Sequence, residues 1–192
     1  MVSDRRGADP PGVERGFLGG LAVLAGIFAL AIDVTGAEAT GRSARTIDSA
    51  NALEGQVLVE LNAIRREHGL VPLRPATSLD AAADLHSRAM ARHGFFAHAS
   101  RDGSGFEKRV ERFYDSKGYG SWSVGENILW ASPTINASEA LQRWLKSPGH
   151  RQNILTPRWR EIGLSVVIVE QAPGVYGNRD VTIITTDFGA RS

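Results

Sequence analysis

Three side chains with the chemistry of an active or metal-binding site lie in short irregular segments of the sequence. His98 stands in FFAHAS, Glu126 in the turn-like VGENIL and His150 in SPGHRQN. Two imidazoles and a carboxylate are ligand types that a borderline divalent cation such as Zn²⁺ accepts. The same groups could serve as a general base and its orienting partner, with Glu126 or a histidine as the base. These residues therefore indicate a metal-binding or an acid–base site and leave the choice open.

The remaining histidines favour structural roles. His68 lies at the end of a predicted helix beside Gly69, where a partly charged imidazole suits the helix dipole. His86 and His93 share one face of the next predicted helix, but the chain contains no HExxH pattern. We therefore expect none of these three histidines to bind a metal ion.

Covalent catalysis has little support in the residue types. The chain has no cysteine, which excludes a cysteine nucleophile, redox catalysis and thiolate zinc sites. Ser147 could form a hydrolytic triad with His150 and Glu126, but no nucleophile-elbow pattern surrounds this serine. Whether the protein is an enzyme stays open at this stage.

Composition is that of one ordinary globular domain. The chain has 192 residues, of which 42% are apolar and 22% charged, and its formal net charge is +1. This apolar content is enough to build a core. Lys and Arg are mixed with acidic residues rather than gathered in a long block, so we expect no nucleic-acid partner.

The N-terminus has the pattern of an export signal. Arg5, Arg6 and Arg15 precede an uncharged apolar run from Phe17 to Ile32, and Ala37-Glu38-Ala39 offers a small-residue cleavage site. The alternative is an uncleaved membrane anchor, although the run would span only roughly 24 Å as a helix. Both interpretations export the rest of the chain, because the arginines hold the N-terminus in the cytoplasm. We expect residues 1–39 to be a signal peptide or anchor, and the protein to be secreted, periplasmic or membrane-anchored.

The rest of the sequence places helices first and most strands later. Residues 40–52 are small and polar and indicate a linker before a domain at 53–190. Apolar spacing and caps predict helices that begin near Asn51, at Thr77 or Ser78, near Phe106 and at Asn136. Alternation predicts strands at 162–168 and 181–188, joined as a hairpin, with a further strand within 121–130. The expected fold is α+β, with a small antiparallel sheet covered by about four helices.

Several segments resemble those of one protein family. FFAHAS, GYGSWSVGENIL, ALQRWLKSPGHRQNIL and WREIGLSV resemble, in this order, motifs of the CAP superfamily. This superfamily unites cysteine-rich secretory proteins, antigen five and plant pathogenesis-related proteins. With the LNAIRREHGLVPL opening and the final TDFG, the resemblance covers about residues 54–188 and is closest to the cysteine-free, SCP-like bacterial branch. It implies an α-β-α sandwich with a cleft over the sheet.

The resemblance also implies a site. It places His98, Glu126 and His150 in the cleft, matching the family's two histidines and the glutamate of its GEN motif. Animal members often carry a second glutamate three residues after a tryptophan, and counting from Trp144 this position is Ser147. Two imidazoles and one carboxylate would still suffice for a zinc site with water as the fourth ligand.

Three functions are compatible with these observations. We favour an extracytoplasmic module that binds a metal ion, a lipid or a cell-envelope ligand in the cleft. A metal-assisted, peptidase-like hydrolase is the alternative, and its support is lowered by the incomplete ligand set. A structural domain with a vestigial cleft is the third, weakened by the retention of two histidines and a glutamate. The family resemblance does not choose among them, because one fold serves many functions.

Overall fold

The computed structural model describes residues 34–192, which belong to one compact unit from Thr35 onward. The predicted signal or anchor run at 17–32 lies outside these residues. Within the described part, no helix is both long and apolar enough to span a bilayer. The elements, in chain order, are α1 (Val34–Glu67), β1 (Arg74–Pro75), α2 (Thr77–His93), α3 (Phe106–Glu111), β2 (Trp122–Ala131), α4 (Ala137–Lys146), α5 (Pro148–Ile154), β3 (Glu161–Ala172), the 3-10 turn η1 (Gly174–Tyr176) and β4 (Arg179–Arg191).

The strands form a single sheet in the order β1-β3-β4-β2. β4 pairs antiparallel with both β3 and β2, while the two-residue β1 joins β3 in parallel. The β3–β4 connection uses left-handed backbone at Gly174, Gly177 and Asn178, with φ of 63°, 63° and 55°. Glycine and asparagine adopt this conformation at low cost. The predicted hairpin is confirmed, and β1 is too short to be recognised from alternation.

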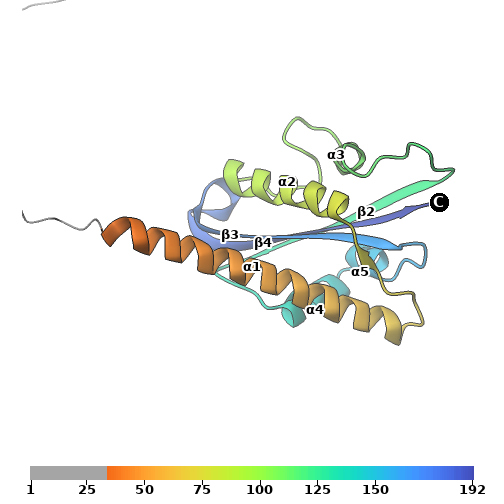
Figure 1. Ribbon diagram of the computed structural model, residues 1–192, viewed down its shortest axis with the longest axis horizontal. Helices are drawn as coiled ribbons and strands as arrows, with labels where there is room; N and C mark the ends of the chain where they lie inside the picture. The colour runs from red at the N-terminus through yellow and green to blue at the C-terminus, as the bar shows by residue number, and fades with distance from the viewer. Residues whose placement is uncertain (1–33) are drawn as a thin grey trace, which may run out of the picture. The chain divides into compact units, whose positions relative to one another are not determined.

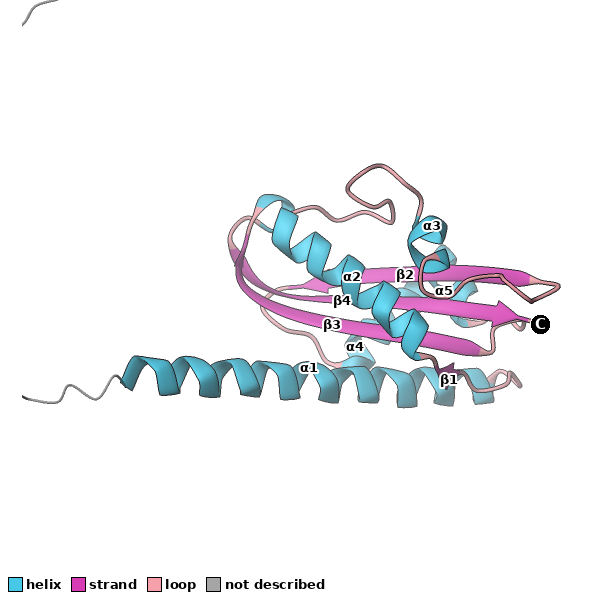
Figure 2. Cartoon of the chain, turned by 45° about the horizontal axis from the view of Figure 1, so that its top comes forward, coloured by secondary structure: helices cyan, strands magenta, loops and turns pink. Residues whose placement is uncertain are grey.

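Helices cover both faces of this sheet. Along β4, Val181 and Ile183 pack in one apolar cluster with Met90 of α2, whereas Ile184 and Phe188 pack in another with residues of α1, α4 and α5. Figure 1 accordingly shows α2 and α3 on one side of the strands and α1 and α4 on the other. The turned view of Figure 2 shows the strands lying side by side between these layers. The expected α+β fold, an α-β-α sandwich, is confirmed.

The predicted linker at 40–52 is wrong, because these residues are helical. α1 begins at Val34 rather than near Asn51, and Asn51 therefore lies inside the helix and does not cap it. Buried Ala50, Leu53, Val57 and Leu61 recur every three or four residues along the face that joins the core. No proline lies within 34–67. The helix that packs on the core from Ala50 onward can therefore extend toward its N-terminus through the polar residues before it.

The outer edge of β3 is protected by two carboxylates. Beyond its short pairing with β1, this edge has no neighbouring strand within residues 34–192. Instead, the backbone N–H of Leu164 donates to Oδ1 of Asp80 over 2.9 Å, and that of Val166 donates to Oε1 of Glu54 over 2.7 Å. Burial raises the pKa of both carboxyl groups, and the backbone hydrogen bonds partly oppose that rise. Side chains of α1 and α2 thus replace a strand partner.

Helix α2 packs directly against the sheet at a glycine of β3. A Cβ atom added at Gly163 of β3 would collide with the backbone of Leu79 and Asp80 in the first turn of α2. The side chains of α2 that face the sheet here are also small, and two of them, Ala82 and Ala83, are fully buried. The close approach of helix and strand therefore depends on the missing side chain.

Gly163→Ala should lower the free energy of unfolding by about 3 kcal/mol, because helix backbone cannot move away as a flexible side chain would. Gly55→Ala is the matched control: a Cβ there meets nothing within 4 Å. Because Gly55 lies within α1, this control should raise stability by about 0.5–1 kcal/mol. Chemical denaturation of both variants checks this, and equal stability of Gly163→Ala and the parent chain would contradict it.

Candidate functional site

The structure brings His98, Glu126 and His150 together at the β2 edge of the sheet. His98 lies between α2 and α3, Glu126 in β2, and His150 in α5. The Nδ1 atom of His98 is 2.7 Å from Oε1 of Glu126, and the centroids of the His98 and His150 rings are 6.5 Å apart. Residues separated by some fifty positions therefore share one site, as the family resemblance implied.

Glu126 lies in the middle of a strand and not in the turn that GEN suggested. It pairs with Asp187 of β4, and its side chain is fully buried. The residues on either side explain the extended backbone. Gly125 fits beneath the ring of Trp159, and Asn127 reaches across to α5. The three GEN positions are therefore packed from both faces of the sheet, which a turn would not allow.

Arg109 of α3 is the counter-ion that neutralises Glu126. Its Nη2 atom pairs with Oε2 of Glu126, and only 3% of the arginine side chain is exposed. Its Nη1 donates to the carbonyl of His98 and to Oγ of Ser100, over 3.3 and 3.1 Å. Both oxygens of Glu126 are thus engaged, one by His98 and one by Arg109. The sequence alone does not single out Arg109, because its neighbours in FEKRVE are also charged.

Hydrogen bonding also sets the tautomer of His98. An ionised carboxylate can only accept, so Nδ1 of His98 must carry the hydrogen that points to Glu126. This leaves Nε2 as the free nitrogen on a side chain that is 49% exposed. The loop that carries His98 is also bonded to α2, because the buried Nε2 of His86 lies 2.8 Å from the carbonyl of Ala97. A buried carboxylate therefore presents one outward-facing imidazole nitrogen.

His150 is positioned by a separate set of amides. Asn127 donates from Nδ2 to the carbonyl of His150 over 3.1 Å. Asn153 donates to Oδ1 of Asn127 and to the carbonyl of Glu126, both over 2.9 Å. Burial, and secondarily the nearby His98, lower the pKa of His150. The imidazole of His150 is therefore neutral at pH 7, which is the form that binds metals or accepts a proton.

Asp187 is a further buried carboxyl group in this site. It lies directly opposite Glu126 and is completely buried, and none of the described residues donates a hydrogen bond to either of its oxygens. Burial and then the charge of Glu126 raise the pKa of Asp187 well above its usual value, while Arg109 opposes this. A protonated Asp187 can donate to Glu126, which leaves one anion and one guanidinium in the cluster. The alternation of β4 through Val181 and Ile183 indicates this inward position.

The donor set is a partial match to a metal site. Within residues 34–192, no three His, Asp or Glu side chains are arranged to hold a metal ion. Glu126 already bonds His98 and Arg109, and Ser147 occupies the position of the family's second glutamate. The residues present fit two imidazole ligands, with Glu126 as the acceptor that orients the first. Direct coordination by Glu126 remains a prediction.

The chain belongs to the CAP, or cysteine-rich secretory protein, family. The family described as "Cysteine-rich secretory protein family" matches residues 58–181, which include all three predicted site residues. The chain is 33% identical over 132 residues to the uncharacterised Bacillus subtilis protein YkwD, covering 68% of this chain and 49% of that protein. It is 31% identical over 114 residues to the uncharacterised B. subtilis membrane protein YlbC, covering 59% and 31%. The chain thus spans half or less of these relatives.

Solved structures show the same fold. An extracellular protein from Bacillus anthracis that contains an SCP domain superposes with a TM-score of 0.57 at 28% identity, over 73% of this chain and 41% of that one. An outer surface protein from Borrelia burgdorferi has a TM-score of 0.57 at 18% identity, over 70% and 90%. The second likeness concerns the fold alone.

Asp187→Asn should raise the free energy of unfolding relative to the parent chain, and this gain should grow as the pH rises from 4 to 7. The pKa of Asp187 is higher in the folded protein than in the unfolded chain. Its contribution to the free energy of unfolding is therefore fully present below the unfolded-state pKa, and it is lost as the pH rises toward the folded-state pKa. The amide keeps the shape and a donor for Glu126 but does not titrate, so Asp187→Asn should gain stability relative to the parent chain over this range.

Glu126→Gln should have the opposite effect and destabilise the protein. It leaves the guanidinium of Arg109 buried without a counter-ion, and should cost about 3–5 kcal/mol. Chemical denaturation of both variants at pH 4 and pH 7 gives the comparison. An Asp187→Asn protein that loses stability relative to the parent chain as the pH rises would show that Asp187 works as an ion.

Proposed function

We propose that this chain is an extracytoplasmic CAP-domain protein that binds a divalent metal ion weakly between His98 and His150. The observation that carries this proposal is the fixed tautomer of His98, whose Nδ1 is bonded to Glu126 at 2.7 Å while its side chain stays half exposed. A carboxylate behind a ligating imidazole is the usual outer-shell arrangement of metal-binding histidines. With two protein ligands, the ion would keep water at its other positions.

Export is part of the proposal. It is supported by the basic residues, apolar run and small-residue site in the first 39 residues. It is also supported by the descriptions of two similar proteins, one extracellular and one a membrane protein. The domain would then meet its ligand outside the cytoplasm, where it has no cysteine to oxidise.

A lipid in the neighbouring groove is less well supported. A hollow of about 270 Å³ lies between α1 and α4, and Ala63, Ile64, Leu141 and Leu145 supply its apolar lining. Pockets that bury drug-sized ligands measure about 300–1,000 Å³. This groove is therefore too small to enclose a whole lipid, and a lipid ligand would have to lie largely on the surface.

Hydrolysis with His98 as general base is the second candidate. The Glu126–His98 pair has the form of a carboxylate that orients an imidazole, with Nε2 free to take a proton. No hydroxyl group of the described residues is hydrogen-bonded to His98 or His150, so water would be the nucleophile. Glu126 is unsuited to act as the base because Arg109 and His98 occupy both its oxygens. This transfers the catalytic assignment from Glu126 to His98.

Calorimetric titration of the full-length chain with Zn²⁺ tests the metal proposal. His98→Ala with His150→Ala should raise the Kd at least tenfold, equivalent to about 1.4 kcal/mol. The control is His68→Ala with His93→Ala, which removes two exposed histidines outside the cleft and should bind as the parent does. Binding should weaken as the pH falls and the imidazoles protonate. Equal affinity in both double variants would overturn the proposal.

The hydrolase candidate has its own assay. Initial rates on a small activated ester and on a model peptide, with and without Zn²⁺, would be compared between the parent chain and His98→Ala. Loss of a general base should slow hydrolysis about 10²–10⁴-fold. Turnover by the parent that persists in His98→Ala would remove this candidate. Metal binding without turnover would leave the binding function alone.

A further inference from the structure

A second hollow lies between α2 and α3, on the side of the sheet opposite α1. Its volume is about 700 Å³. None of His98, Glu126 and His150 lines it, although Arg109, which pairs with Glu126, does. Leu85 and Ala89 of α2 form an apolar wall. The polar lining comes from His86 of α2, from the loop before α3 and from α3 and its end, and includes the cations Arg101, Lys108, Arg109 and Arg112.

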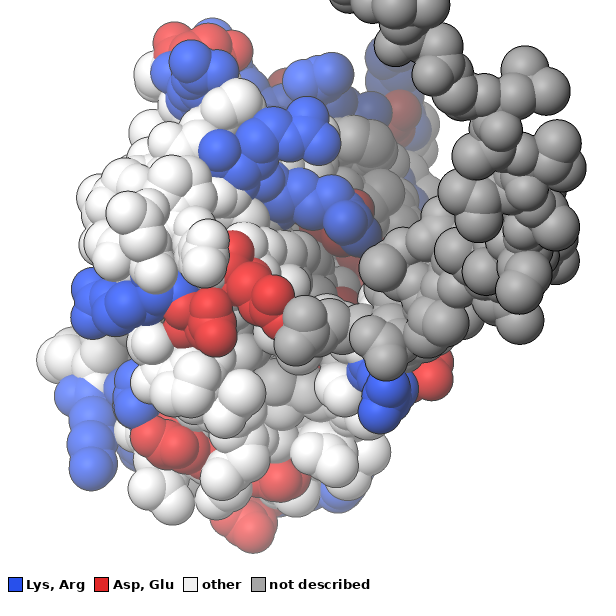
Figure 3. All heavy atoms as spheres, turned by 90° about the vertical axis from the view of Figure 1, so that its left-hand side faces the viewer, with Lys and Arg blue, Asp and Glu red and all other residues white. Residues whose placement is uncertain are grey.

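The exposed lining of this hollow carries a small excess of positive charge. Arg101, Lys108 and Arg112 stand against two acidic residues, and the charge of the fourth lining cation, Arg109, is matched by Glu126. Within the described part of the chain, Lys108 and Arg112 have no ion-pair partner, and the Nη1 atom of Arg101 lies 3.3 Å from Nδ1 of His93. Figure 3 shows several Lys and Arg side chains close together at the top of the molecule, the side on which Figure 1 places α2 and α3.

Asp102, one of the two acidic residues of the lining, is hydrogen-bonded within its own loop. Asp102 accepts from the backbone N–H and the hydroxyl of Ser104, over 3.0 and 2.7 Å, and these bonds lower its pKa. Its carboxylate is therefore occupied in the turn of its own loop. The basic side chains of Lys108 and Arg112 remain available to a ligand.

A buried donor adds to these exposed cations. The Nε–H of Arg109 is buried and has no hydrogen-bond partner among the described residues, although both terminal nitrogens of the same guanidinium are bonded. Leaving a buried donor unpaired is costly, so such groups usually mark a bound water, ion or functional role. Arg109 itself lines the hollow. A ligand acceptor that reached this nitrogen would supply the missing hydrogen-bond partner.

We propose that the hollow between α2 and α3 binds the phosphate group of a small organic ligand. A phosphate oxygen accepts from guanidinium and ammonium groups in charge-assisted hydrogen bonds. Ser100 and Ser104 supply hydroxyl groups at the same wall, and Leu85 and Ala89 provide contact for an apolar remainder of the ligand. The volume exceeds that of a bare phosphate, which favours a phosphomonoester or phosphodiester.

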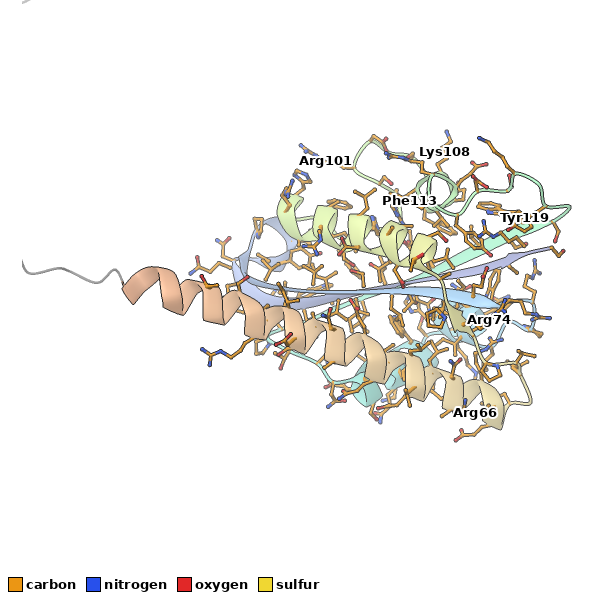
Figure 4. The ribbon with its side chains drawn as sticks, in the orientation of Figure 1. Arg66, Arg74, Arg101, Lys108, Phe113 and Tyr119 are labelled. Carbon is orange, nitrogen blue, oxygen red and sulfur yellow. The ribbon has the colours of Figure 1, made fainter. Side chains whose placement is uncertain are left out.

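The test compares two double variants of the full-length chain with equal loss of charge. Lys108→Gln with Arg112→Gln removes two exposed cations from the hollow. Arg66→Gln with Arg74→Gln removes two exposed cations that lie on the other side of the molecule from Arg101 and Lys108, as Figure 4 shows. Calorimetry at low salt would use three probes: inorganic phosphate, glycerol phosphate, and short-chain dihexanoyl phosphatidylglycerol below its micelle concentration. Thermal unfolding of both variants verifies that neither is misfolded.

The hollow variant should bind at least tenfold more weakly than the parent and the control variant, and added salt should weaken binding in the parent. Binding of the two soluble phosphates with this dependence supports the proposal and identifies a free phosphate ester. Binding of the short-chain lipid alone, with the same dependence, supports it and identifies a lipid headgroup. No binding of any probe, or equal binding by the two double variants, overturns it. The Zn²⁺ titration tests the proposed metal site at His98 and His150 separately, so its result does not depend on these outcomes.

Discussion

The ion pair between Glu126 and Arg109 is the constraint on which the site depends. A carboxylate in the middle of a covered sheet has no access to water, and an isolated charge there would be strongly unfavourable. Arg109 supplies the opposite charge from α3, 17 residues earlier in the chain. To do so, α3 must lie over β2, and the loop that precedes it must pass beside the β2 edge. The position of His98 is a consequence of that path.

The two imidazoles are held by independent means, which suits a site for a small ligand. His98 is fixed through its ring, by the bond from Nδ1 to Glu126. His150 is fixed through its backbone, because Asn127 and Asn153 tie α5 to β2. One ring is therefore oriented by a hydrogen bond, whereas the other forms no side-chain hydrogen bond with the described residues. A ligand placed between them would be met by one preorganised group and one adaptable group.

Local patterns in the sequence predict much of the architecture, and the contacts that complete the site are non-local. The α2 helix and the β3–β4 hairpin follow from apolar periodicity, and the three motif residues follow from their types and the family resemblance. Arg109 is indistinguishable in the sequence from exposed Lys108. The alternation of β4 gives Asp187 an inward position, but only the register between β2 and β4 places it opposite Glu126. The helical start of α1 was missed because small polar residues resemble a linker.

The carboxylates at the outer edge of β3 bear on how this protein behaves among copies of itself. An uncovered edge strand is a template for pairing with another chain, and thus a route to aggregation. Asp80 and Glu54 occupy the N–H groups of Leu164 and Val166 with side chains, which cannot extend the ladder as a strand would. Colloidal stability therefore depends partly on two acidic residues outside the cleft. Substitution of either residue would reduce solubility while leaving His98, Glu126 and His150 unchanged.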